Sequence, residues 1–325
     1  EISCSLVGSE MCIRDRVSIP ILIAIIAIDY ELLIKIAPIL YGIITLLLAG
    51  VLFTTPINGA TSWYNIGAVS FQPAELAKIV IILSLTYTIV KIQARGKKEI
   101  NVIYKLAIIL GVAMVPVLLI IKQPDYGTAI AFIMALIFML FVAGIDKKYI
   151  IIAIAVVIVA VPLLYFFILP EHAKTRIDVY LNPNLDPRGA GYNIIQSKLA
   201  IGAGQLFGMG LLKGNQTQLG FLYPKTTDFI FSVIGEELGF IFAAGIIVLY
   251  VVLITKAIYV AKTAKDLEGS YIAAGIAGIF FFHMLENIGM TMGLLPITGI
   301  PLPFVSYGGS SLLSNIICLL YTSPS

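Results

Sequence analysis

Five long stretches of this chain carry no charged residue, and they constrain its fold more than any other feature. They cover residues 36–74, 126–145, 149–170, 238–255 and 287 to the end. The hydrocarbon core of a bilayer is about 30 Å thick and requires roughly 20 apolar residues for each spanning helix. Stretches of this length predict an all-α, polytopic transmembrane helix bundle.

The composition agrees with this prediction. Of the 325 residues, 59% are hydrophobic and 12% are charged, and the net charge is +3. A soluble domain carries about 25% charged residues. Because so little charge cannot cover a surface exposed to water, a soluble enzyme, a disordered chain and a nucleic-acid-binding protein are all poor fits. The three cysteines show no C-x-x-C spacing and the two histidines are far apart, so no zinc-binding pattern is present.

Residues 1–16 and 320–325 differ from the rest of the chain. The first string is polar without helical period, and the second ends an apolar segment in Leu-Tyr-Thr-Ser-Pro-Ser. Both resemble translated sequencing-adapter read-through, so we expect non-native tails around a single domain at 17–319. A signal peptide is the weaker alternative, since the first string carries the acidic residues Glu1, Glu10 and Asp15 and no apolar core with a cleavage site precedes Val17. Genomic DNA is expected to encode different residues at both ends, and a gene that reads through both strings unchanged would refute this interpretation.

Lightly charged apolar runs extend the prediction to about nine segments, the first and last of them incomplete. The segments are 17–29, 32–54, 75–92, 102–121, 127–145, 149–169, 230–257, 271–292 and the residues from about 308 onward. Short loops rich in Lys and Arg follow the third, fifth and seventh of these, which places those loops in the cytoplasm. The long loop 170–229 then lies on the opposite side. Its helix-like run Tyr192–Ile201 and its many glycines favour a folded extracytoplasmic cap over a free tether.

Ionisable residues inside apolar spans are costly and indicate functional sites. Glu75 and Lys78 lie three residues apart at the start of the third segment, so they share one helix face and can pair. A structural ion pair and a functional pair are both compatible with this spacing. Asp125, in the hinge Gln123-Pro124-Asp125, is explained slightly better as the cap of the next helix.

A further carboxylate, Asp228, lies where the long polar loop meets the 230–257 span, beside Lys225. A carboxylate at such an interface is suited to general-base catalysis, but an Asp before an apolar run is also the expected helix N-cap. Ser306 and Ser310 precede the last segment, where a helix N-terminus can bind an anion. No histidine lies near them in sequence, which disfavours a serine nucleophile.

Several segments resemble one family in the order in which that family has them. They are Trp63-Tyr64-Asn65-Ile66-Gly67 with Gln72 to Lys78, Gln123 to Thr128, Gly191 to Gly202, Thr227 to Gly239, and Asn287-Ile288-Gly289-Met290 through Ser306 to Ser311. The family is SEDS (shape, elongation, division, sporulation), and the resemblance covers nearly all of 17–319. Gly214 to Leu222 is more similar to its elongation members than to its division members. One departure is Pro224-Lys225, where the family often has Pro-Glu.

The resemblance implies a peptidoglycan glycosyltransferase that polymerises lipid II and releases undecaprenyl pyrophosphate. It also implies ten transmembrane helices, so that the first helix and most of the last are missing here. The essential aspartate of the family corresponds to Asp228, and its paired Glu and Lys correspond to Glu75 and Lys78. The residues that we expect to bind substrate or support the site are Glu75, Lys78, Trp63, Asp125, Arg176, Lys198, Glu237, Ser306 and Ser310.

Partners and a cofactor are implied by the same resemblance. They are a class B penicillin-binding protein, other membrane proteins of the elongation complex, and a divalent cation (Mg or Mn) for which this sequence shows no ligand cluster. Two alternatives come from other classes of protein. One is a transporter, either a lipid II flippase or a carrier that uses Glu75, Asp125 and Glu286 as relays; the other is a non-catalytic scaffold for a transpeptidase. All of these readings place the chain in the bacterial cytoplasmic membrane.

Overall fold

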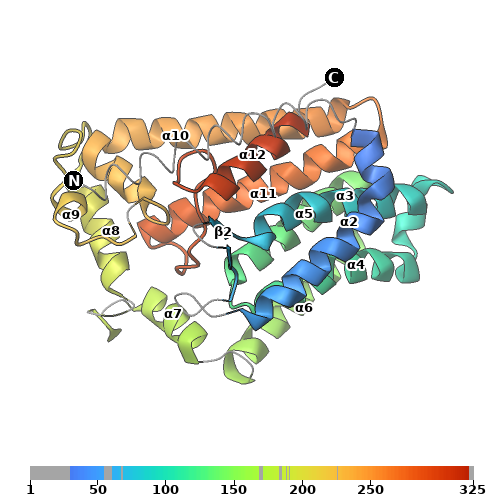
Figure 1. Ribbon diagram of the computed structural model, residues 1–325, viewed down its shortest axis with the longest axis horizontal. Helices are drawn as coiled ribbons and strands as arrows, with labels where there is room; N and C mark the ends of the chain where they lie inside the picture. Colours follow the sequence, from blue (N-terminus) through green and yellow to red (C-terminus); the bar gives the residue numbers. More distant parts are fainter. Residues whose placement is uncertain are drawn as a thin grey trace. The chain divides into compact units, whose positions relative to one another are not determined.

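Helices form nearly all the regular structure of this computed structural model (Figure 1). The structure describes residues 30–54, 61–66, 69–167, 171–182, 185–187, 189, 191–224 and 226–321. The helices are α2 (Tyr30–Gly50), η1 (Val51–Phe53), α3 (Pro73–Gln93), η2 (Lys97–Asn101), α4 (Ile103–Lys122), α5 (Tyr126–Ala143), α6 (Lys147–Phe167), α7 (Glu171–Leu181), α8 (Tyr192–Ala203), α9 (Asn215–Gln218), α10 (Ile230–Thr263), α11 (Leu267–Met292) and α12 (Gly309–Tyr321). Two short strands, β1 (Tyr64–Ile66) and β2 (Val69–Phe71), form an antiparallel hairpin.

Each predicted span from 32–54 onward corresponds to one of the long helices or to α12. Within the described residues, six helices are long and apolar enough to cross a bilayer, namely α2 with η1, α4, α5, α6, α10 and α11. The prediction of an all-helical membrane bundle is therefore confirmed, with the β1–β2 hairpin as an addition. The predicted 17–29 segment, the tail 1–16 and residues 322–325 lie outside the described residues.

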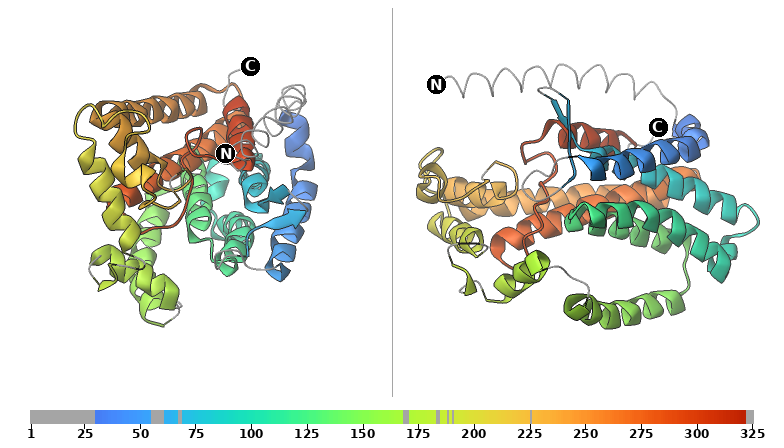
Figure 2. Two further views of the ribbon diagram at one scale, coloured as in Figure 1. Left: turned by 60° about the vertical axis from the view of Figure 1, so that its left-hand side comes forward. Right: turned by 60° about the horizontal axis from the view of Figure 1, so that its bottom comes forward.

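The chain divides into two compact units, which are described separately. The first consists of residues 1–144, 254–280 and 307–325, and the second of residues 145–253 and 281–306. The helices α10 and α11 contribute to both units. In the first unit, α3 packs against α2, α4, α5 and α12, and the hairpin directly precedes α3 (Figure 2).

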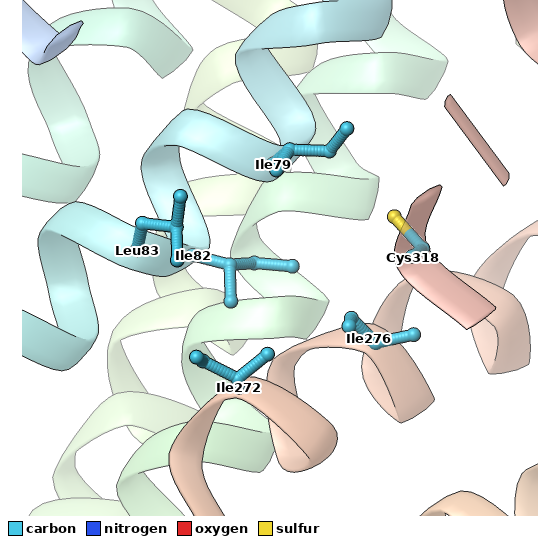
Figure 3. Close-up of a pocket in the computed structure, with 6 residues that line it drawn as sticks. All are labelled: Ile79, Ile82, Leu83, Ile272, Ile276 and Cys318. Carbon is cyan, nitrogen blue, oxygen red and sulfur yellow. The ribbon is translucent and has the colours of Figure 1, made fainter. Parts of the chain in front are cut away.

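Close helix packing in the first unit depends on small residues. A Cβ added at Gly278 of α11 would lie 2.8 Å from the carbonyl oxygen of Met134 in α5, and one at Gly275 would lie 3.0 Å from the sulfur of Met139. Since no hydrophobic force draws helices together in lipid, such close approach is what holds a membrane bundle together. A small apolar pocket between α3, α11 and α12 completes this packing (Figure 3); it is lined by Ile79, Ile82, Leu83, Ile272, Ile276 and Cys318.

The local sequence explains where α3 and α5 begin and end. Pro73 occupies the first turn of α3 and Glu75 follows it there, which suits the N-terminal end of the helix dipole. Asp125 caps α5, because its side chain accepts a hydrogen bond of 3.2 Å from the Thr128 N–H. Gly144 ends α5 in the left-handed conformation at φ 84°. The predicted cap at Asp125 is confirmed.

In the second unit, α10 is interrupted at Gly239, whose backbone has φ 80° and ψ −176°. This conformation is far from helical and is readily adopted only by glycine. A Cβ added there would lie 2.3 Å from the backbone nitrogen of Gly208. Nothing in the residue pattern indicates this break, because the predicted 230–257 segment is a single apolar run with few charges.

We expect Gly239→Ala to lower the free energy of unfolding by more than about 1 kcal/mol, because it adds both backbone strain and a steric clash. Gly245→Ala is the matched control on the same helix, since a Cβ at Gly245 meets nothing within 4 Å. That control is expected to be neutral or slightly stabilising. The two variants are compared by thermal unfolding of purified protein, and equal stability would contradict the predicted strain at Gly239.

Candidate functional site

The candidate residues fall into two clusters, one in each compact unit. The first cluster lies at the starts of α3, α5 and α12 in the first unit. The Lys78 ammonium is 2.9 Å from a Glu75 carboxylate oxygen, and the two side chains are only 2% and 8% exposed. The predicted pair is therefore confirmed, and it is a buried one.

Two hydrogen bonds extend this cluster to other helices. The Ser314 hydroxyl of α12 donates to the same oxygen of Glu75 at 2.6 Å. The Gln72 amide, just before α3, donates to Asp125 at 3.2 Å. Burial raises the pKa of the Asp125 carboxyl above its ordinary value, and the hydrogen bonds from Thr128 offset only part of this shift. The starts of three helices are thus tied together through the carboxylates of Glu75 and Asp125.

Apart from the Glu75 carboxylate 2.9 Å away, the buried Lys78 nitrogen has no hydrogen-bond partner among the residues that the structure describes. An ammonium has three N–H donors, and burying them without partners is costly. The Lys78 ammonium therefore has N–H donors that the described residues leave unused. Sequence reasoning found Glu75 and Lys78 but missed Ser314, for which a serine inside an apolar helix was the only signal.

The second cluster surrounds Asp228 in the turn that leads into α10 (in the second unit). The side-chain amide of Asn287, in α11, donates to the Asp228 carbonyl at 2.9 Å and to the Ile300 carbonyl at 2.8 Å. Asp228 itself is partly exposed. Its carboxylate lies next to Gly299, where an added Cβ would be 3.3 Å from Oδ2.

Ser306 fixes the same turn from the other side. Its hydroxyl donates to the Thr227 carbonyl at 2.6 Å and accepts from the Leu302 N–H at 2.7 Å. Asn287 therefore binds the carbonyl of Asp228 itself, and Ser306 binds the carbonyl of the preceding residue, Thr227. Together they fix the backbone that carries the Asp228 carboxylate. Ser306 was predicted as an anion-binding residue; in the structure its hydroxyl serves these two backbone contacts.

We expect Ser306→Ala to destabilise the turn by about 1–3 kcal/mol, because it leaves the Thr227 carbonyl and the Leu302 N–H without this partner. The polymerisation of lipid II that the family resemblance implies is expected to become slower without being abolished, since the variant retains Asp228. Ser306→Thr keeps the hydroxyl and is the matched control. Turnover and unfolding temperature are measured on both variants, and an Ala variant indistinguishable from the Thr variant would contradict this role.

The remaining predicted residues occupy varied places. Lys198 is exposed on α8, and its side chain lies over Gly293, where an added Cβ would be 2.1 Å from its Cε. The buried Ser197 beside it donates to the Thr291 carbonyl at 2.6 Å, which fixes α8 against α11. Trp63 is partly buried before β1, and Ser310 is partly exposed in the first turn of α12. Arg176 lies on α7 with its side chain outside the described part of the chain, and Lys225 lies outside the described residues altogether.

Glu237 has a structural environment that the sequence did not indicate. Together with the neighbouring Glu236 it accepts hydrogen bonds from the backbone of the 212–218 loop. Glu236 accepts from the Gln216 and Thr217 N–H groups at 2.7 and 3.0 Å. Glu237 accepts from the Leu212 N–H at 3.0 Å and from the Gln218 amide at 2.8 Å. These contacts anchor the loop to α10.

The fold and these clusters define a polytopic membrane protein with carboxylates and cations at the starts of its helices. The family described as "Cell cycle protein", which groups FtsW, RodA and SpoVE, matches residues 11–321. The chain belongs to this family, as the sequence resemblance predicted. It is therefore a multi-pass protein of the bacterial cytoplasmic membrane.

Curated relatives and solved structures agree with this membership. The "Peptidoglycan glycosyltransferase MrdB" of Escherichia coli (strain K12) is 40% identical over 278 residues, which are 85% of this chain and 74% of that protein. The "Peptidoglycan glycosyltransferase RodA" of Treponema pallidum is 32% identical and covers 85% of this chain and 79% of its own length. Each of these names states the activity of the relative that carries it.

Two solved structures have the same fold. A chain from "Structural coordination of polymerization and crosslinking by a peptidoglycan synthase complex" has a TM-score of 0.82 and 28% identity, covering 96% of this chain and 86% of that one. The rod shape determining protein RodA of Thermus thermophilus has a TM-score of 0.67 and 27% identity, covering 94% of this chain and 84% of its own. The chain is thus RodA-like in fold as well as in sequence.

Proposed function

We propose that this chain is a peptidoglycan glycosyltransferase that polymerises lipid II during cell elongation, with Asp228 as the general base. The family and the names of the relatives support the activity. The observation that carries the assignment of Asp228 is its setting: a partly exposed carboxylate at the start of an apolar helix, with its backbone held by Asn287 and Ser306. Such fixation is what a base needs in order to meet a substrate hydroxyl in one geometry.

The reaction joins two lipid-linked disaccharides. The 4-hydroxyl oxygen of the acceptor sugar forms a bond to the anomeric carbon of the donor, and the bond from that carbon to the pyrophosphate oxygen breaks. The Asp228 carboxylate takes the hydroxyl proton as the new bond forms. Undecaprenyl pyrophosphate leaves with the electron pair of the broken bond, so its negative charge requires cations nearby.

Lys198 and Arg176, in the same unit as Asp228, are the proposed contacts to that pyrophosphate, and Lys78 of the first unit is proposed to support the site through its buried pair with Glu75. Lys198 is exposed and held beside Gly293. Lys78 has hydrogen-bonding capacity that no described residue uses. Glu75 and Ser314 would orient Lys78, while Trp63, Asp125, Glu237 and Ser310 would support the site through the elements on which they lie.

A divalent cation remains part of the proposal only as an expectation from the family resemblance. In the described residues, no group of three or more His, Cys, Asp or Glu side chains is placed to hold a metal ion. These residues do not fit a metal site built by the protein alone. No step of the reaction is therefore assigned to a metal.

The proposed topology follows the sequence. The loop 170–229 lies outside the cytoplasm, the full family fold has ten spans, and about nine are present here. The proposed partners are a class B penicillin-binding protein and other membrane proteins of the elongation complex. A structural relative from a complex described as coordinating polymerization and crosslinking supports such a partner.

The test is incubation of the purified full chain with lipid II, followed by gel separation of glycan strands and mass detection of undecaprenyl pyrophosphate. We expect a ladder of strands that a muramidase digests, together with released undecaprenyl pyrophosphate. Unchanged lipid II after incubation of folded protein with a class B penicillin-binding protein present would contradict the proposal.

A further inference from the structure

The segment Gly204–Phe221 is inserted against the break in α10 at Gly239, within the second unit (Figure 1). A broken helix leaves carbonyl groups unpaired at the end of its first half and N–H groups unpaired at the start of its second half. This segment supplies the missing partners on both sides of the break. We refer to it below as the inserted segment.

Four backbone hydrogen bonds make the connection. The Met209 and Gly210 N–H groups donate to the carbonyls of Glu236 and Glu237 at 2.9 and 3.0 Å. The Phe240 and Ile241 N–H groups donate to the carbonyls of Gln205 and Leu206 at 2.9 and 3.3 Å. Glycines permit this approach: a Cβ at Gly208 would lie 2.2 Å from the Glu237 carbonyl oxygen, and one at Gly204 would lie 1.8 Å from that of Gly235.

The carboxylates of Glu236 and Glu237 satisfy further polar groups of the inserted segment. They accept from the backbone N–H groups of Leu212, Gln216 and Thr217 and from the Gln218 amide. Non-helical backbone is tolerated at the depth of a membrane only when its hydrogen bonds are satisfied within the protein. The hydrogen bonds above meet much of this requirement, and the buried side-chain oxygen of Gln216 is the exception, with no partner among the described residues.

Most outward-facing side chains of the inserted segment are apolar, beside the exposed polar residues Gln205, Lys213, Asn215 and Gln218. Six of the apolar side chains are between 44% and 79% exposed: Leu206, Phe207, Leu211, Leu212, Leu219 and Phe221. Lys213 is the single charged residue between Lys198 and Lys225. A water-exposed loop is normally polar, whereas a lone lysine can extend its ammonium to the membrane surface.

The apolar surface of the inserted segment continues onto α10. Directly after the break, Phe240, Ile241 and Phe242 are 52% to 63% exposed, and they lie on a helix long and apolar enough to span a bilayer. The same short stretch of α10 that carries these side chains is hydrogen-bonded to Gln205 and Leu206. Both views in Figure 2 draw the inserted segment alongside α10.

We propose that the inserted segment is a re-entrant element whose exposed side chains lie among lipid acyl chains, at the depth of the Phe240–Phe242 turn of α10. The loop 170–229 is then not a purely aqueous cap, because its middle part returns into the bilayer. Lipid is the occupant that fits, since the surface is mostly apolar, carries Lys213 as its one charge, and continues onto a helix long and apolar enough to span a bilayer. This inference does not depend on the reaction proposed above.

The test places a tryptophan on the inserted segment and measures quenching by brominated lipid. Phe207→Trp and Leu212→Trp are made in the full chain, and the signal of Trp63 in the parent is subtracted. Both positions are highly exposed, so the substitutions leave the packing intact. The proteins are reconstituted in phosphatidylcholine vesicles with or without bromine on the acyl chains. Phe240→Trp is the lipid-facing reference, and Lys97→Trp, at the exposed first residue of η2, is the aqueous reference.

We expect the fractional loss of fluorescence at positions 207 and 212 to match that at position 240, with protection from aqueous iodide. A loss that matches position 97, with full quenching by iodide, would overturn the proposal. In that case the apolar surface would be accessible to water in the isolated protein and available to a protein partner instead.

Discussion

Asp228→Asn is expected to reduce lipid II polymerisation by about 10²- to 10⁴-fold, the contribution that a positioned general base makes to a rate. The amide has nearly the same shape as the carboxylate but cannot take the proton of the acceptor hydroxyl. The contacts that hold the turn involve the backbone carbonyls of Thr227 and Asp228, so the substitution leaves them in place. The variant should therefore remain folded and still bind lipid II.

The matched control is Asp186→Asn, which makes the same chemical change elsewhere in the second unit, where Asp186 accepts a hydrogen bond from the Gly189 N–H at 2.9 Å. Strand synthesis, unfolding temperature and lipid II binding are measured for both variants. We expect near-normal synthesis from the control. Near-normal synthesis from Asp228→Asn would remove this residue from the mechanism.

The buried pair Glu75–Lys78 gives the second large effect. Removing one partner of a buried ion pair leaves an uncompensated charge and costs about 3–5 kcal/mol. Glu75→Met and Lys78→Met are each expected to lower stability by this amount. The double variant removes both charges and should recover most of the loss, because apolar side chains of similar volume replace such pairs with little penalty.

Polymerisation separates a structural from a functional role of this pair. We expect the double variant to be folded but defective, because it lacks the buried charges of Glu75 and Lys78 that are proposed to support the site. The exposed pair Asp146–Lys148, at 3.4 Å with side chains 50% and 60% exposed, is the control, and its removal should cost less than about 1 kcal/mol. Thermal unfolding and strand synthesis are measured on the whole set. A stable, fully active double variant would contradict the functional role of the pair. Single variants as stable as the wild type would contradict the predicted cost of removing one partner of the buried pair.

The helices and several contacts of the candidate site could be predicted from the sequence. The apolar runs located every long helix in the described residues, because a membrane span is a local property of about 20 residues. The Glu75–Lys78 pair and the Asp125 cap were also predictable, because helix geometry relates residues three apart. Asp228 and Ser306 were identified through the family resemblance and their place before a span.

What the sequence did not reveal depends on contacts between distant segments. Gly239 lies in an apolar run, and only its φ angle and the approach of Gly208 show that α10 is broken there. Asn287 and Ser314 act on residues 59 and 239 positions away along the chain. Glu236 and Glu237 looked like charges at the edge of a span, but they accept hydrogen bonds from a loop some 20 residues earlier.

The most direct test of the central claim follows fluorescent lipid II in vesicles that contain the purified full chain together with a class B penicillin-binding protein. Chain growth and movement of lipid II between leaflets are measured on the same sample. If the chain is a glycosyltransferase, glycan strands form on wild-type vesicles and are lost with Asp228→Asn. Movement between leaflets without chain growth would instead identify a carrier, and neither process in folded protein would identify a scaffold; either result would contradict the account.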